Sequence, residues 1–157
     1  MDLLGKTPIN PFLFYTGKLA GYACWIILLT SSLEIYSVGQ PYNKFFRILS
    51  LVLATGGMIL VMVSLINLGR STRLGVPTDD TILKTGGLYK YSRNPMYFGF
   101  SLFTISAILY TWHVFILLVG IYSLIIYHFI ILGEEKFLKQ RFGEEYEQYI
   151  QKVRRYI

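Results

Sequence analysis

Charged residues are scarce in this chain of 157 residues, where Asp, Glu, Lys and Arg together make up only 15%. A soluble globular domain usually carries about a quarter charged residues. Hydrophobic residues instead reach 54%, and the mean hydropathy is +0.47. The shortage of charge therefore argues against an ordinary soluble domain and indicates a membrane protein.

Cysteine and histidine are also scarce. Cys24 is the single cysteine and lies inside an apolar run, so it cannot form an intrachain disulfide and an inert buried thiol is expected. His113 and His128 belong to no Cys-x-x-Cys or His-Glu-x-x-His pattern, which leaves the sequence without a recognisable metal site. Neither GxGxxG nor a P-loop occurs, so a Rossmann nucleotide site has no support.

Long apolar runs predict an all-α, polytopic membrane protein with about four transmembrane helices. The spans are expected at about residues 11–36, 43–69, 95–110 and 112–132. Lys18 lies within the first span and is expected either to snorkel or to face the bundle. A signal peptide is the alternative for this segment, but a long region precedes it and no small-x-small cleavage site follows.

The third and fourth predicted spans form a helical hairpin at the C-terminal side. The third has about 16 residues, or roughly 24 Å, less than the roughly 30 Å of a hydrocarbon core, so its start is expected near the membrane surface. After the fourth span, aromatic and apolar residues recur at helical spacing in an amphipathic tail helix, with a break expected at Gly143. We expect one domain over residues 1–157, with two spans in 1–69 and a loop, two spans and the tail in 70–157.

The net charge is +6, and the basic residues cluster at the ends of apolar runs. This distribution indicates membrane topology rather than a nucleic-acid-binding surface. The segment 70–93 holds five Lys or Arg residues and the tail after Leu132 holds six, whereas the connection between the first two spans contributes Lys44. The positive-inside rule places both basic segments on the cytoplasmic face. Both termini are therefore expected to be cytoplasmic.

The polar stretch GGLYKYSRNPMYFG, residues 86–99, directly precedes the third span. Asn94 and Pro95 suit the N-cap and first position of a helix, whose free N–H groups would face the cytoplasm. Antiparallel pairing of the last two spans is expected to bring Glu134 and Glu135 beside Arg93 and Asn94.

Two interpretations of this cluster are open. In the structural one, Arg93 pairs with a glutamate to close the hairpin and the tyrosines anchor the membrane interface. In the functional one, the glutamates hold a cation, Arg93 and the helix N-terminus hold an anion, and the tyrosines stack on a ring. S-Adenosylmethionine has all three features, and NADPH also satisfies the physical criteria.

Two motifs resemble one superfamily of membrane enzymes. Residues 86–99 are similar to the Gly-x-Tyr-x-x-x-Arg-His-Pro-x-Tyr-x-Gly motif of the isoprenylcysteine carboxyl methyltransferase and phospholipid methyltransferase superfamily. The tail GEEKFLKQRFGEEYEQYIQKV resembles the same superfamily's Glu-Glu-x-x-Leu…Phe-Gly-x-x-Tyr-x-x-Tyr. The match covers roughly residues 65–154, with the order and spacing of the motifs retained. It implies an integral membrane methyltransferase that uses S-adenosylmethionine.

The resemblance implies roles for individual residues. The cofactor-binding residues would be Leu88, Tyr89, Asn94, Pro95, Tyr97, His128, Glu134 and Glu135. The catalytic set would be Glu134, Glu135 and Arg93, with Arg93 serving the cofactor carboxylate or shaping the site. The alternative for His128 is a packed, hydrogen-bonded interior histidine.

Three positions depart from the superfamily pattern. Asn94 stands where relatives often have histidine, and because an amide does not titrate, a general-base role there is not expected. Arg154 replaces a proline that is frequent in the tail. Ile130 occupies the place of an arginine that the carboxyl methyltransferases carry about four residues before the acidic pair, and this departure favours a lipid amine or another lipophilic acceptor over a prenylcysteine carboxylate.

The expected function is methyl transfer from S-adenosylmethionine to a lipophilic acceptor, either an isoprenylcysteine carboxylate or a lipid amine. The expected partners are that lipophilic or lipidated substrate and the membrane lipids, without nucleic acid. The enzyme alternative is an NADPH-dependent oxidoreductase of the sterol reductase kind, which resembles the Arg-His-Pro-x-Tyr motif but is usually much longer. The remaining alternative is a non-catalytic four-span membrane protein.

Overall fold

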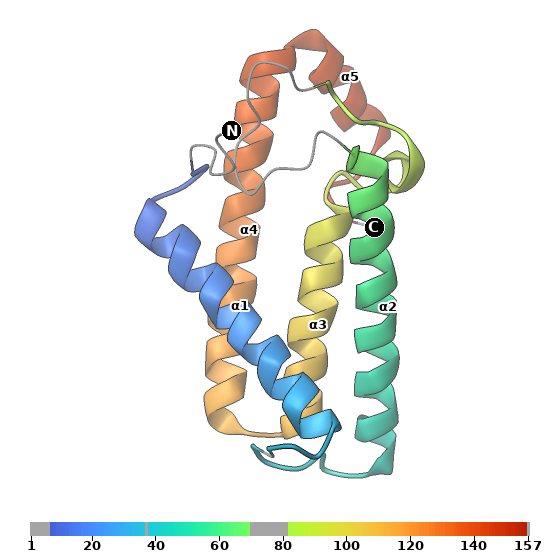
Figure 1. Cartoon of the computed structure of the whole chain (residues 1–157). Coiled ribbons are helices and arrows are strands. Elements are labelled where there is room, and N and C mark those ends of the chain that lie inside the picture. Colours follow the sequence, from blue (N-terminus) through green and yellow to red (C-terminus); the bar gives the residue numbers. More distant parts are fainter. Residues whose placement is uncertain (1–6, 37, 70–81, 157) are drawn as a thin grey trace.

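The fold is a bundle of helices in which the first helix crosses the others obliquely (Figure 1). A computed structural model describes residues 7–36, 38–69 and 82–156. Its elements are α1 (Pro11–Ser32), α2 (Lys44–Leu68), the short 3-10 helix η2 (Gly87–Lys90), α3 (Pro95–Thr111), α4 (Val114–Phe142) and α5 (Glu144–Lys152). Within these ranges the chain forms no strand, only an isolated bridge between Ser92 and Arg154.

The lengths of the helices confirm the predicted all-α, polytopic architecture. The helices α1, α2 and α4 have 22, 25 and 29 residues and are long and apolar enough to cross a membrane. The apolar α3 has 17 residues, which corresponds to about 26 Å at 1.5 Å per residue. It is thus the short member of the predicted hairpin.

The fourth helix extends ten residues beyond its predicted end at Leu132, to Phe142. Hydropathy falls after Leu132, but the residues that follow are mostly good helix formers and no proline interrupts them. The helix ends where Gly143 adopts a φ of 51°, which confirms the predicted break. Glu134 and Glu135 therefore lie on the same rigid helix as the fourth span.

Close packing of α2 against α3 depends on two facing glycines. A Cβ atom added at Gly57 would lie 2.8 Å from the carbonyl oxygen of Gly99, and one added at Gly99 would lie 2.8 Å from that of Gly57. Small residues allow membrane helices to approach this closely. The same interface holds a hydrogen bond of 2.6 Å from the Ser106 hydroxyl to the Ser50 carbonyl.

We predict that Gly57→Ala destabilises the protein by about 1–3 kcal/mol, the usual cost of overpacking. The added methyl would meet backbone that cannot move without separating α2 from α3. Gly56→Ala is the matched control, because a Cβ at Gly56 meets nothing within 4 Å. The midpoint of thermal unfolding in detergent checks this, and equal midpoints for the two variants would contradict the close approach.

The first helix packs against α4 through a second pair of glycines. The Ile126 side chain fills the space beside Gly17, and the Tyr127 hydroxyl fills the space beside Gly21. The Ser123 hydroxyl donates a 3.0 Å hydrogen bond to the Gly17 carbonyl. This contact fixes which face of α1 turns toward the bundle.

Both described ends of the chain lie at the same end of the bundle, the upper one in Figure 1. Near the N-terminus, the Pro8 carbonyl oxygen lies 2.4 Å from where a Cβ of Gly133 would be. Near the C-terminus, Arg154 forms an isolated β-bridge with Ser92, just before α3. The described ends of the chain therefore share one end of the bundle, and the location of both termini in the cytoplasm stays a prediction from the Lys and Arg counts.

Candidate active site

The chain after α5 lies alongside the residues that lead into α3. The Arg93 amide donates a 3.0 Å hydrogen bond to the Arg154 carbonyl, and the Ser92 hydroxyl donates one of 3.4 Å to the Arg155 carbonyl. The Tyr149 hydroxyl, on α5, donates a 2.6 Å bond to the Tyr89 carbonyl. Burial raises the pKa of Tyr149 to about 12, so this phenol stays protonated and remains a donor. The tail thus covers the polar stretch.

Glu135 is the centre of this contact. Its Oε1 accepts hydrogen bonds from Arg93 Nε at 3.1 Å, Arg93 Nη2 at 3.0 Å and Asn94 Nδ2 at 3.1 Å. Its Oε2 accepts one from Arg155 Nε at 2.9 Å and lies 2.9 Å from Arg155 Nη2. Both carboxylate oxygens are therefore occupied by groups of the protein itself.

Arg93 joins three segments of the chain. Besides bonding to Glu135, its Nη1 donates to the Val153 carbonyl at 2.9 Å and to the Ile150 carbonyl at 3.4 Å. Its side chain is only 8% exposed. All three guanidinium nitrogens thus bond to protein, which gives Arg93 the geometry of a positioning residue. The four residues Arg93, Asn94, Glu135 and Arg155 are called the tail clamp below.

Glu134 faces a different way from Glu135, because consecutive helix residues are about 100° apart. Its Oε1 accepts a 2.6 Å hydrogen bond from the hydroxyl of Tyr97, which lies buried on α3. Its Oε2 accepts no hydrogen bond from the residues that the structure describes. Glu134 also interacts electrostatically with the Lys18 ammonium of α1. Among the described residues, Glu134 is thus the one of the two acids with a carboxylate oxygen that accepts no hydrogen bond.

Asn94 occupies the N-cap position of α3, but its side chain does not cap the helix, so the predicted cap was wrong in this respect. The side-chain Nδ2 of Asn94 instead donates hydrogen bonds to Glu135 Oε1 and, at 3.2 Å, to the Arg155 carbonyl. Pro95, the first helical residue, has no N–H. The next N–H groups of α3, on Met96 and Tyr97, therefore donate no hydrogen bond to the Asn94 side chain.

The short helix η2 carries Leu88 and Tyr89. The Leu88 amide donates a 2.8 Å hydrogen bond to Asn67 Oδ1 of α2, which fixes η2 to the end of that helix. Tyr89 is buried, and burial raises the pKa of its hydroxyl, whereas Tyr91 is 75% exposed. Asn67 received no role from the sequence, because its partner is a backbone amide 21 residues away.

His128 lies apart from the Tyr97–Glu134 pair. Its Nδ1 is 2.6 Å from the Tyr156 hydroxyl, and the two rings stack with their centroids 6.2 Å apart on an exposed surface. Six helix positions separate His128 from Glu134, which corresponds to about 240° of rotation around α4. His128 is hydrogen-bonded, as the structural alternative expected, but it is not interior.

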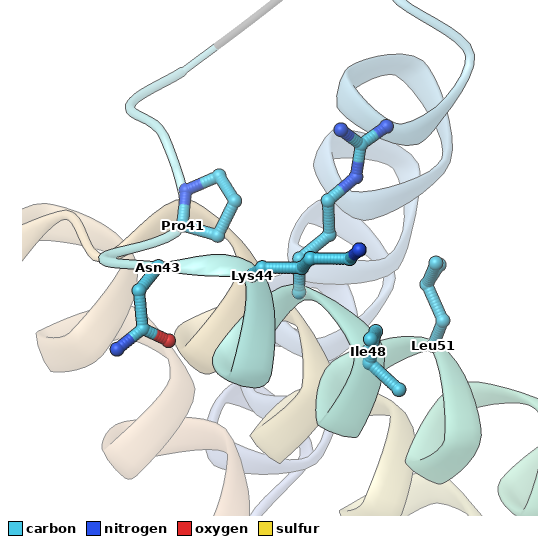
Figure 2. Close-up of a pocket in the computed structure, with 6 residues that line it drawn as sticks. Pro41, Asn43, Lys44, Ile48 and Leu51 are labelled. Atoms are coloured by element: carbon cyan, nitrogen blue, oxygen red, sulfur yellow. The ribbon is translucent and has the colours of Figure 1, made fainter.

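A surface depression lies where α2 begins (Figure 2), at the lower end of the bundle in Figure 1. It is lined by Pro41, Asn43, Lys44, Arg47, Ile48 and Leu51. Arg47 is also 3.9 Å from Glu34, and both of these side chains are exposed. The depression contains none of the residues assigned to the site from the sequence, so we place the candidate active site at Tyr97 and Glu134.

The helices and their polar cluster define an integral membrane protein with a carboxylate site at one end of its bundle. The chain matches the family model of phospholipid methyltransferases over residues 45–145, from α2 into α5. It belongs to this family, which confirms the resemblance seen in the two motifs.

A named relative is the protein-S-isoprenylcysteine O-methyltransferase of Schizosaccharomyces pombe. The two sequences are 31% identical over 122 residues, which cover 76% of this chain and 49% of the relative. This chain thus spans about half the length of the curated relative that it matches.

Proposed function

We propose that the protein transfers a methyl group from S-adenosylmethionine to a lipophilic acceptor at the cytoplasmic face of the membrane. The observation that carries this proposal is the Tyr97–Glu134 pair, which lies within the range that matches the family and whose Glu134 Oε2 accepts no hydrogen bond from the described residues. The name of the relative, an O-methyltransferase, supports methyl transfer.

The donors and acceptors of the site fit S-adenosylmethionine. Glu134 Oε2 is available for an ammonium or a ribose hydroxyl. The uncapped start of α3 offers N–H groups and partial positive charge to a carboxylate. Tyr97 and Tyr89 place buried aromatic rings near the same helix end. When bound, this cofactor supplies an electrophilic methyl group.

The residues of the chain then have to align the acceptor and exclude water. Alignment of two reacting groups can contribute roughly 7–11 kcal/mol to lowering the barrier. A carboxylate acceptor needs no base, whereas an ammonium acceptor has to lose a proton first. Glu134 is the base available for that proton, because the tail clamp occupies Glu135 and Asn94 does not titrate.

The cytoplasmic assignment rests on the basic residues at this end. Lys84, Lys90 and Arg93 lie on the described part of the connection, whereas Arg70 and Arg73 lie outside the described residues. The lipid acceptor would enter sideways from the bilayer and the cofactor from the cytoplasm. We propose the acceptor and the membrane lipids as partners, without nucleic acid.

We expect S-adenosylhomocysteine to stabilise the detergent-purified protein. A ligand that binds only the folded state adds about 2.7 kcal/mol to the free energy of unfolding at 100 times its dissociation constant. The thermal unfolding midpoint, measured with and without the ligand, checks this.

NADPH is the comparison ligand for the same assay. A shift with NADPH alone would favour an oxidoreductase of the sterol reductase kind. The absence of a shift with millimolar S-adenosylhomocysteine would contradict the methyltransferase proposal, and no shift with either ligand would favour the non-catalytic alternative.

A further inference from the structure

Lys18 is the one charged residue of α1, and the steps described above do not use it. A charged side chain within a membrane span is energetically costly, and such residues commonly mark functional sites. The start of α1 lies near Gly133, because Pro8 contacts that glycine. Lys18 is seven residues after Pro11, so its backbone lies about 10 Å deeper along the helix than that end.

The Lys18 side chain extends back toward the end of the bundle that carries Glu134. Side chains on a helix tilt toward its N-terminus, so Lys18 reaches the preceding turn. There its Nζ lies 4.1 Å from the centroid of the Phe14 ring. Phe14 is buried in one cluster with Tyr97, Ile126, Tyr127, Ile130 and Ile131. The ammonium therefore lies beside the helices that hold the Tyr97–Glu134 pair.

The Lys18 ammonium has no close anionic partner in the described part of the chain. It makes no ion pair or hydrogen bond there, although it interacts with Glu134 at longer range. The contact with the Phe14 ring offsets only part of the cost of burying this charge. Ile130, fully buried in the same cluster, supplies no charge. An anion from outside the chain would complete this arrangement.

We propose that Lys18 determines acceptor specificity by binding a carboxylate of the lipid on the membrane side of the Tyr97–Glu134 pair. This inference rests on the methyl transfer proposed above. A half-buried ammonium attracts an acidic acceptor and repels an amine acceptor, so the acceptor class is the lipid carboxylate. Ile130 by itself favoured a lipid amine, but the positive charge comes from α1, outside both sequence motifs.

The chemistry of a carboxylate acceptor agrees with this role. A lone pair of the carboxylate oxygen forms the new C–O bond, while the electrons of the C–S bond stay on sulfur and leave a neutral thioether. No proton is released, so no base is needed. The ester product has lost the negative charge that Lys18 binds, and its release is therefore favoured over that of the substrate.

A binding experiment tests Lys18 without cofactor. Two ligands are compared, an S-isoprenylcysteine with a free carboxylate and its carboxamide, with the protein in nanodiscs of phosphatidylcholine. We expect wild type to bind the carboxylate at least about 10-fold more tightly, the size of one charge-assisted hydrogen bond. Lys18→Gln should reduce this preference to within about twofold, and Lys18→Arg should restore most of it. Lys44→Gln, which removes the same charge at the other end of the bundle, should retain it.

Several results would overturn the inference. Equal binding of the carboxylate and the carboxamide by wild type would overturn the inference, and this test does not depend on whether Lys18→Gln folds. A folded Lys18→Gln that keeps the wild-type preference for the carboxylate would also overturn it. An effect of Lys18→Gln that appears only when phosphatidylglycerol is added would assign the residue to bulk lipid headgroups instead. If S-adenosylhomocysteine stabilises the protein but the carboxylate is not preferred, only the role proposed for Lys18 is refuted. If S-adenosylhomocysteine does not stabilise the protein, the proposed methyl transfer is refuted.

Discussion

Glu134→Gln is expected to lower kcat/KM for methyl transfer by about 100-fold, or ~2.7 kcal/mol, the size of a hydrogen bond to a charged group. The amide keeps an oxygen for the Tyr97 hydroxyl, whose bond to Glu134 is 2.6 Å long, but it removes the negative charge offered to the cofactor. Folding should be retained, because Glu134 makes no contribution to the tail clamp. Transfer of labelled methyl from S-adenosylmethionine, together with the unfolding midpoint, measures both effects.

Glu145→Gln is the matched control for this variant. Glu145 is an exposed acid in the first turn of α5, so the same chemical change there should leave kcat/KM within about twofold of wild type. Activity of Glu134→Gln equal to that of the control would show that the Tyr97–Glu134 pair is structural.

The sequence predicted the helices well because hydropathy alone separates the spans. The glycine at 143 marked the end of α4 by its conformational freedom. The end predicted at Leu132 was wrong because hydropathy reports the environment of a segment, whereas continuation of a helix depends on propensity. Residues after Leu132 are polar but helix-forming, so α4 leaves the apolar region without ending.

The sequence predicted which residues form the polar cluster but not how they are arranged, and their roles in a site stay a prediction. Glu134 and Glu135 were treated as one acidic pair, and their 100° separation gives them different neighbours. Which of them faces α3 depends on the rotation of α4 against α3, and the sequence does not encode that rotation locally. Arg155 was missed for a similar reason, since its contact with Glu135 spans 20 residues and a helix break.

Lys18 illustrates what a local signal can add. Gly17 and Gly21 are four residues apart, which marks one face of α1 for close packing. Lys18 is adjacent to that face, so it could be placed near the bundle from sequence alone. Its approach to Glu134 requires the arrangement of α1 against α4, which only the structure supplies.

Glu135→Gln is expected to destabilise the protein by about 3–5 kcal/mol, because it leaves Arg93 as a buried charge without its counter-ion. Arg93→Met should cost a similar amount. Arg155→Gln should cost less, since the Arg155 side chain is 37% exposed and water can replace its partner. Thermal unfolding and the rate of tryptic cleavage after Lys152 report the loss of the tail.

The exposed pair of Lys139 and Glu147 provides the control for this order. Its Nζ–Oε1 distance is 3.0 Å, equal to the Arg93 Nη2–Glu135 Oε1 distance, but its side chains are 60% and 52% exposed. Glu147→Gln should therefore cost no more than about 1 kcal/mol. A cost for Glu135→Gln as small as that for Glu147→Gln would contradict the clamp. A large loss of stability in Glu135→Gln but not in Glu134→Gln would show that the two acids have different roles. Glu135 would then hold the tail, and Glu134 would remain available for chemistry.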